Sequence, residues 1–136
     1  MTVLADTSIW VRHIREGTQG PAAGLDDLLA RGLVVICGPV AAELIAGTAE
    51  RDREELWAAL GALPWAGLDR SGWRTAGECA GTLRRGGSPL PMTDIVIAAT
   101  ALAAGASVWS LDQDFVRIAD ALPGLELYSP QPGSSR

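Results

Sequence analysis

Short apolar runs alternate with helical patterns along almost the whole chain, and this alternation constrains the fold more than any other feature. Runs such as LVVIC, at residues 33–37, are rich in β-branched side chains and predict buried strands. We expect strands at residues 2–5, 33–37, 65–68, 107–109 and 125–128. Because helices separate these strands, the pattern favours an α/β fold with a mainly parallel central sheet of four or five strands flanked by helices.

The segments between the strands carry helical periodicity and helix-boundary residues. We expect helices at residues 8–15, 21–32, 39–47, 49–63, 69–85 and 93–104, and a short helix around Phe115 and Ile118. Ser8 and Thr93 are the expected N-caps of the first and the last of the six long helices, because hydroxyl side chains accept hydrogen bonds from free backbone N–H groups. Residues 95–104 are almost wholly apolar and small, which predicts a helix that is buried on most sides.

The length of the chain fits one domain with its own core. The chain has 136 residues, of which 48% are hydrophobic, and we find no internal repeat or linker in it. We therefore expect one domain over residues 1–130. Residues 131–136 are polar and include proline and glycine, so we expect a disordered C-terminal tail there.

Charge and cysteine content argue against several classes of protein. The net charge of −5 gives no overall basic surface for nucleic acid, although acids gathered at a metal site would also lower the charge. Cys37 and Cys79 form no CxxC pattern, which argues against a disulfide framework or a zinc site. We see no signal-peptide pattern and no apolar run of transmembrane length, so we expect a cytoplasmic protein that does not enter the membrane.

Four acidic residues are expected at one edge of the sheet. Asp6 and Asp112 follow predicted strands directly, Glu43 lies in the helix after the second strand, and Asp94 opens the buried helix that leads into the strand at residues 107–109. In a parallel sheet, functional groups gather outside the carboxyl ends of the strands. Each acid alone could be a helix cap, a partner of a helix dipole or an exposed residue. Their meeting at one edge favours a functional site.

Such a cluster of carboxylates needs a compensating charge. At a separation of about 4 Å and an effective dielectric constant near 20, each pair of like charges costs roughly 4 kcal/mol. Cations must therefore bind, or some of the acids must be protonated. Carboxylate oxygens with no nearby His or Cys favour Mg²⁺ or Mn²⁺ over zinc. A carboxylate-bound divalent ion is suited to phosphoryl transfer, because it lowers the pKa of a bound water and orients the phosphate.

The chain resembles PIN-domain nucleases, and more closely the VapC-type toxins of type II toxin–antitoxin modules. The resemblance covers about residues 1–128 and rests on VLADTSIWVRHIR, PVAAELIAG, LPMTDIVIAATAL and SLDQDF, in that order. It implies a PIN-like fold and an endoribonuclease that needs Mg²⁺ or Mn²⁺. It also implies a homodimer and a cognate antitoxin protein that blocks the site.

By motif, the catalytic acids of this family fall on Asp6, Glu43, Asp94 and Asp112. The resemblance then suggests that Asp6, Asp94 and Asp112 hold the metal ion, while Glu43 orients or deprotonates the attacking water. We expect hydrolysis of an RNA phosphodiester to a 5′-phosphate and a 3′-hydroxyl.

Other residues are expected to support this site. Asp114 is an auxiliary acid that competes with Asp112 for the fourth position. Thr7 and Ser8 are expected hydroxyl or backbone N–H donors to ligand carboxylates or phosphate, and Ser110 is expected to support the ligands. Four arginines are candidate contacts for RNA or for the antitoxin: Arg12, Arg15, Arg84 and Arg85.

Other α/β proteins with acids at strand ends fit less well. A phosphoacceptor receiver domain needs a lysine late in the chain, and this chain has none. A haloacid-dehalogenase-type phosphatase needs a second aspartate two residues after the first, where this chain has Ser8. A dinucleotide-binding module needs a glycine-rich first turn. One alternative stays open, namely a catalytically inert PIN-like module that binds RNA or protein.

Overall fold

A four-stranded parallel sheet forms the centre of the computed structural model, which describes residues 1–130. Its strands lie in the order β3-β2-β1-β4. Their bounds are Val3–Ala5 for β1, Val34–Cys37 for β2, Trp65–Ala66 for β3 and Ser107–Trp109 for β4. All three strand pairings are parallel, which confirms the predicted α/β architecture.

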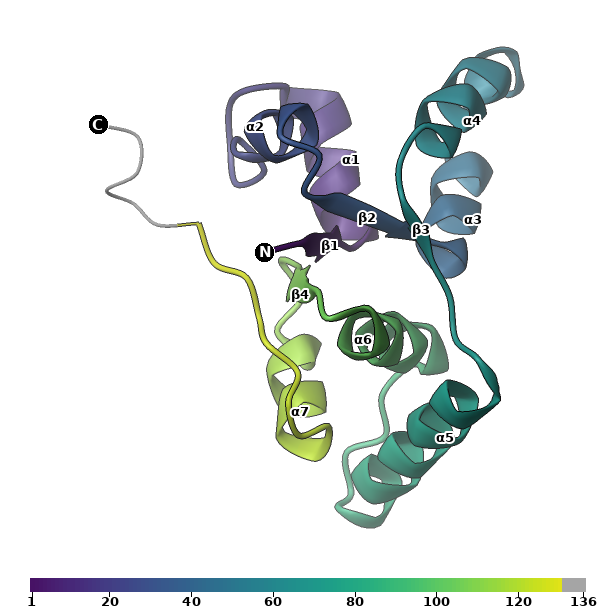
Figure 1. Ribbon diagram of the computed structural model, residues 1–136, viewed down its shortest axis with the longest axis vertical. Coiled ribbons are helices and arrows are strands. Elements are labelled where there is room, and N and C mark those ends of the chain that lie inside the picture. Colours follow the sequence, from purple (N-terminus) through teal and green to yellow (C-terminus); the bar gives the residue numbers. More distant parts are fainter. Residues whose placement is uncertain (131–136) are drawn as a thin grey trace.

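Seven α-helices flank the sheet in the described part of the chain. They are α1 (Thr7–Glu16), α2 (Leu25–Ala30), α3 (Gly38–Ala46), α4 (Arg53–Gly61), α5 (Arg70–Arg85), α6 (Met92–Ala104) and α7 (Asp114–Ala121). Figure 1 shows α1 and α2 on one side of the strands, α5, α6 and α7 on the other, and α3 and α4 beside β3. Among residues 1–130, no helix has the length and apolar character needed to cross a membrane.

The helix α6 is the main apolar support of the sheet. Seven consecutive residues from Ile95 to Ala101 are buried, as the sequence predicted, and α6 packs against β3 and β4 as well as against α3, α5 and α7. Ile95 and Ile97 are each only 1% exposed. Burying one side chain of this size stabilises the fold by about 1.5–3 kcal/mol. This packing fixes where the first turn of α6, with Asp94, meets the sheet.

Parallel pairing brings the carboxyl ends of the strands to one edge. Ala5 pairs with Trp109 and Leu4 with Val35, so β1, β2 and β4 end side by side. The next residues along the chain are Asp6, Gly38 of α3 and Ser110. Because α6 turns into β4 within a few residues, through Gly105 in a left-handed conformation (φ 68°), the helix runs against the strands and begins at this same edge.

Two predicted helix caps are wrong. The N-cap of α1 is Asp6, whose backbone is extended (φ −78°, ψ 178°) and whose carboxylate accepts a hydrogen bond from the Ile9 N–H, so Ser8 lies inside the first turn. The N-cap of α6 is Pro91, and Thr93 is the second helical residue. Proline fixes φ in the range that suits this position and lets the helix begin at Met92.

Other element boundaries also differ from the predictions. The predicted strand at residues 125–128 is only an isolated bridge between Val108 and Leu127. The predicted helix at residues 21–32 forms only over α2, after a turn at residues 21–24, and the helix predicted from residue 49 begins as a short 3₁₀ helix, Glu50–Asp52. The predicted tail at residues 131–136 lies outside the described residues.

Candidate active site

Five acidic residues lie together at the carboxyl edge of the sheet. Asp94, Asp112 and Asp114 each offer a carboxylate oxygen, and these three oxygens lie within 4.8 Å of one another. The charges of Asp6 and Glu43 also act on Asp94. The structure therefore brings Asp94, Asp112 and Asp114 into one group, while Asp6 and Glu43 lie outside that group and near enough for their charges to act on Asp94.

Asp94 is at the electrostatic centre of this group. It is the third residue of α6 and is partly buried. The pKa of Asp94 is raised from 3.8 to about 6, first by desolvation and then by the charges of Asp112, Asp6, Asp114 and Glu43, in that order of importance. The N-terminal dipole of α6 favours a negative charge here and offsets part of this cost.

Asp6 is the most buried of the acids, at 6% exposure. Its Oδ1 accepts hydrogen bonds from the Ser8 hydroxyl at 2.5 Å and from the Ile9 N–H at 3.3 Å, and its Oδ2 accepts one from the Ser110 hydroxyl at 2.5 Å. Burial raises the pKa of Asp6, and these hydrogen bonds act in the opposite direction. Asp6 therefore caps α1 and also faces the acidic group, so the two interpretations that the sequence allowed are compatible.

The loop from Ser110 to Asp114 holds two acids beside Asp94. The Ser110 hydroxyl accepts a hydrogen bond from the Asp112 N–H at 2.9 Å, and the Asp112 carboxylate accepts one from the Asp114 N–H at 2.9 Å. Asp114 also pairs with Arg117 at 3.5 Å. Because both Asp112 and Asp114 belong to the group around Asp94, the arrangement does not favour one of them over the other.

Glu43 is joined to the site through α1. The Thr7 hydroxyl donates a hydrogen bond to Glu43 Oε1 at 2.7 Å. Glu43 is exposed on α3, whereas Asp6, the residue before Thr7, is buried. The bond therefore orients an otherwise mobile side chain at the rim of the acidic group.

The four candidate arginines lie on the surface. Among residues 1–130, none of them forms an ion pair or hydrogen bond with the acidic group, and Arg12 pairs with Glu16 of its own helix at 3.6 Å. All four are exposed: Arg12, Arg15, Arg84 and Arg85. Their predicted contacts with RNA or antitoxin stay predictions.

Ser8 donates to the Asp6 carboxylate, as expected from the sequence, and has one further contact that was not predicted. Besides donating to Asp6, its hydroxyl accepts a hydrogen bond from the Leu111 N–H at 3.1 Å. The bond to Asp6 joins residues only two positions apart, in a segment where both aspartate and serine favour a helix start. The contact with Leu111 spans 103 residues and has no signal in one sequence.

The donor set suits a hard divalent cation. In an octahedral Mg²⁺ site with bonds of 2.0–2.1 Å, any two ligand atoms are at most about 4.2 Å apart, so three carboxylate oxygens within 4.8 Å of one another need only small shifts to bind one ion. No His or Cys belongs to this group among the described residues. Oxygen-only ligands favour Mg²⁺ or Mn²⁺ over zinc, which agrees with the expected cofactor.

The raised pKa of Asp94 predicts how stability depends on pH when cations are removed. The pKa of this carboxyl group rises from 3.8 to about 6 on folding. Its contribution to the free energy of unfolding is therefore at its full value below pH 3.8. That contribution is lost as the pH rises through about 6. In EDTA, we expect the free energy of unfolding measured with urea to contain a component that falls over this range. Asp94→Asn should remove this component, and an unchanged pH profile in the variant would contradict the assignment.

Comparison with known proteins supports the same fold. The family model described as "PIN domain" matches residues 3–121. No curated protein sequence gives a significant match.

Several solved structures are similar over nearly the whole chain. VapBC2 from Rickettsia felis, bound to a DNA fragment from its promoter, has 22% identity and a TM-score of 0.74 over 96% of this chain and 100% of that chain. VapBC-1 from nontypeable Haemophilus influenzae has 23% identity and a TM-score of 0.75 over 95% and 98%. VapC20 from Mycobacterium tuberculosis, described as a sarcin–ricin loop cleaving toxin, has 17% identity and a TM-score of 0.64 over 95% and 100%.

Proposed function

Since the chain belongs to the PIN-domain family, we propose that it is a metal-dependent endoribonuclease and the toxin of a type II toxin–antitoxin module. The observation that carries this proposal is the acidic group itself. Asp94, Asp112 and Asp114 offer oxygens within 4.8 Å of one another, and Asp6 and Glu43 act on Asp94 from neighbouring elements. Without a cation, so many carboxylates in one place would only destabilise the fold.

The acids have different parts in the proposed reaction. Asp6, Asp94 and Asp112 would hold Mg²⁺ or Mn²⁺, with Asp114 beside Asp112 as a further oxygen donor. A cation bound there would orient the scissile phosphate and neutralise the charge that develops on it. Glu43 is held through Oε1 by Thr7, so its other oxygen is free to orient the attacking water and accept its proton. Attack at phosphorus would leave a 5′-phosphate and a 3′-hydroxyl.

The toxin part of the proposal is supported by the similar structures. Two of them are described as VapBC structures, a further one from Mycobacterium tuberculosis is described as a member of the VapBC family of toxin–antitoxin systems, and one is described as a toxin that cleaves the sarcin–ricin loop. We therefore propose a cognate antitoxin as partner, an RNA substrate, a homodimeric state and a location in the cytoplasm. The exposed arginines of α1 and α5 are the proposed contacts for RNA phosphates or antitoxin carboxylates.

Incubation of the purified protein, free of antitoxin, with total bacterial RNA tests the enzymatic proposal. We expect cleavage in Mg²⁺ or Mn²⁺, none in EDTA, and none by Asp6→Ala in either condition. Wild-type protein that binds RNA but leaves it intact in both metals would favour the inert binding module. Growth arrest on induction of the gene, relieved by the neighbouring reading frame, would separately test the toxin role.

A further inference from the structure

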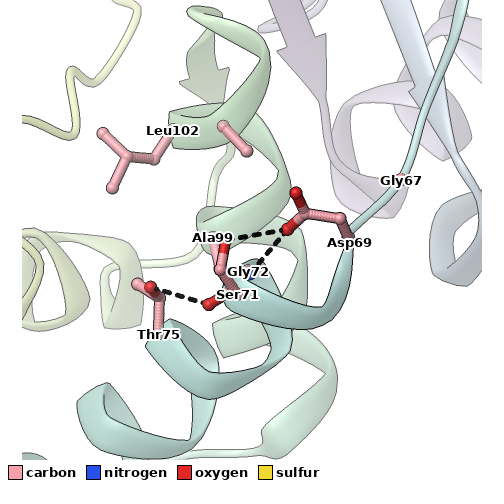
Figure 2. A pocket seen from close by; sticks show the side chains of 8 residues that line it. Gly67, Asp69, Ser71, Gly72, Thr75, Ala99 and Leu102 are labelled. Atoms are coloured by element: carbon pink, nitrogen blue, oxygen red, sulfur yellow. Dashed lines mark hydrogen bonds between the residues drawn. The ribbon is translucent and has the colours of Figure 1, made fainter.

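Two helices of this chain begin with the same turn. At α1, Asp6 Oδ1 accepts hydrogen bonds from the Ser8 hydroxyl at 2.5 Å and from the Ile9 N–H at 3.3 Å. At α5, Asp69 Oδ1 accepts them from the Ser71 hydroxyl at 3.0 Å and from the Gly72 N–H at 2.8 Å, as Figure 2 shows. In both turns the serine stands two residues after the capping aspartate, so the local chemistry is matched.

The surroundings of the two turns differ. Asp69 is exposed beside a shallow groove between α5 and α6, and its hydrogen bonds, that of Gly72 first, lower its pKa. Asp6 is buried, and burial raises its pKa in spite of the same bonds. Within residues 1–130, the Ser71 hydroxyl has its hydrogen bond to Asp69 and no other, whereas the Ser8 hydroxyl also accepts one from Leu111.

Ser8 therefore provides the second of two hydrogen-bonded bridges between the Asp6 carboxylate and the loop at Leu111 and Asp112. We call this pair of bridges the tether. Through Ser8, Asp6 Oδ1 is linked to the Leu111 N–H, and through Ser110, Asp6 Oδ2 is linked to the Asp112 N–H. These two amides are consecutive in the loop that carries Asp112. A single bridge would leave the loop free to pivot about one point, whereas two bridges fix its orientation relative to Asp6.

We infer that Ser8 is a positioning residue of the acidic centre, which holds the loop at Leu111 and Asp112 against the repulsion between the carboxylates. This inference rests on the proposed function, because it assumes that the acids act together on a cation. Loss of the Ser8 hydroxyl leaves the Leu111 N–H without its acceptor and Asp6 Oδ1 with the Ile9 N–H as its one remaining donor, so the loop moves away from Asp94 when cations are absent. Removing such a supporting hydrogen bond typically lowers metal affinity or activity about 10–100-fold.

Ser8→Ala tests the inference against its matched control, Ser71→Ala. We expect Ser8→Ala to weaken Mn²⁺ binding at least about 10-fold by calorimetry, and Ser71→Ala to bind Mn²⁺ like the wild type, although both lose the same local hydrogen bond. Ser8→Thr keeps a hydroxyl and should restore most of the affinity. Equal Mn²⁺ affinity in Ser8→Ala, Ser71→Ala and the wild type would overturn the inference.

Amide exchange of the wild-type protein gives a measurement that does not depend on any variant folding. The Leu111 N–H should be protected from hydrogen exchange without any metal, although Leu111 itself is exposed. Fast exchange at Leu111, at the rate of an unstructured peptide, would overturn the tether. In Ser8→Ala its protection should be lost, and in Ser71→Ala it should stay.

The outcomes separate this inference from the proposed function. Wild-type protein that binds Mn²⁺ but cleaves no RNA would contradict the ribonuclease proposal, and the affinity of Ser8→Ala would still decide the role of Ser8. Wild-type protein that cleaves RNA, together with a Ser8→Ala variant of unchanged affinity and rate, would overturn only the role of Ser8. Wild-type protein that binds no Mn²⁺ would overturn both.

Discussion

Asp94→Asn should lower cation-dependent RNA cleavage at least about 100-fold while leaving the fold intact, because an enzyme that loses one charge-stabilising group at its reacting centre typically loses 10²–10³ in rate. Asp94 belongs to the group of three carboxylates, and the charges of Asp6 and Glu43 also act on it. The amide is nearly isosteric with the carboxyl group, and the packing of α6 should not change. Cleavage rates under single-turnover conditions in Mn²⁺ measure the effect.

Asp120→Asn is the matched control for this result. Asp120 is exposed on α7 and lies outside the acidic group. Its substitution by asparagine changes the net charge of the protein as Asp94→Asn does, but leaves the acidic group intact. We expect its cleavage rate to equal that of the wild type. Equal rates for Asp94→Asn and the wild type would show that the acidic group has no part in cleavage, and equal losses in both variants would point to net charge instead.

Mn²⁺ or Mg²⁺ should raise the melting temperature of the wild-type protein by roughly 10 °C at a concentration near 100 times its dissociation constant. Binding to the folded state alone stabilises it by about 2.7 kcal/mol at that concentration. In a domain of this size each kcal/mol shifts the melting temperature by about 3–5 °C. The physical cause is the relief of repulsion among the acids around Asp94.

Thermal unfolding followed by circular dichroism, with and without EDTA, measures this shift. Asp94→Asn should show a much smaller shift in Mn²⁺, because it removes one ligand and part of the repulsion at once. Asp69→Asn removes an exposed carboxylate of the same turn type and should leave the shift unchanged, because asparagine also caps a helix. A wild-type melting temperature that does not change in millimolar Mn²⁺ or Mg²⁺ would contradict the presence of a cation site.

The position of the site could be predicted because it follows from topology alone. Strands at residues 2–5, 33–37 and 107–109 are visible as apolar runs, and helices between them force parallel pairing. Residues that follow such strands must then meet at one edge. This reasoning places Asp6 and Asp112 correctly without any knowledge of side-chain contacts.

The details of the site depend on contacts that a single sequence does not encode locally. The burial of Asp6 results from packing by several elements, which a local sequence pattern does not reveal. The sequence therefore did not predict that Asp6 both caps α1 and acts on the acidic group. The bond between Ser8 and Leu111 joins residues 103 positions apart. Asp114 could not be ranked against Asp112, because both follow β4 and the shape of one short loop decides where each points.

The central claim, that this acidic group cleaves RNA with the help of a divalent cation, is tested most directly by mapping the ends of the cut RNA. Antitoxin-free protein is incubated with total RNA in Mg²⁺ or in EDTA, and the new ends are sequenced by methods specific for each end chemistry. We predict discrete cuts with 5′-phosphate and 3′-hydroxyl ends in Mg²⁺ only, absent with Asp94→Asn. Intact RNA, or cuts with cyclic phosphate ends that persist in EDTA, would contradict it.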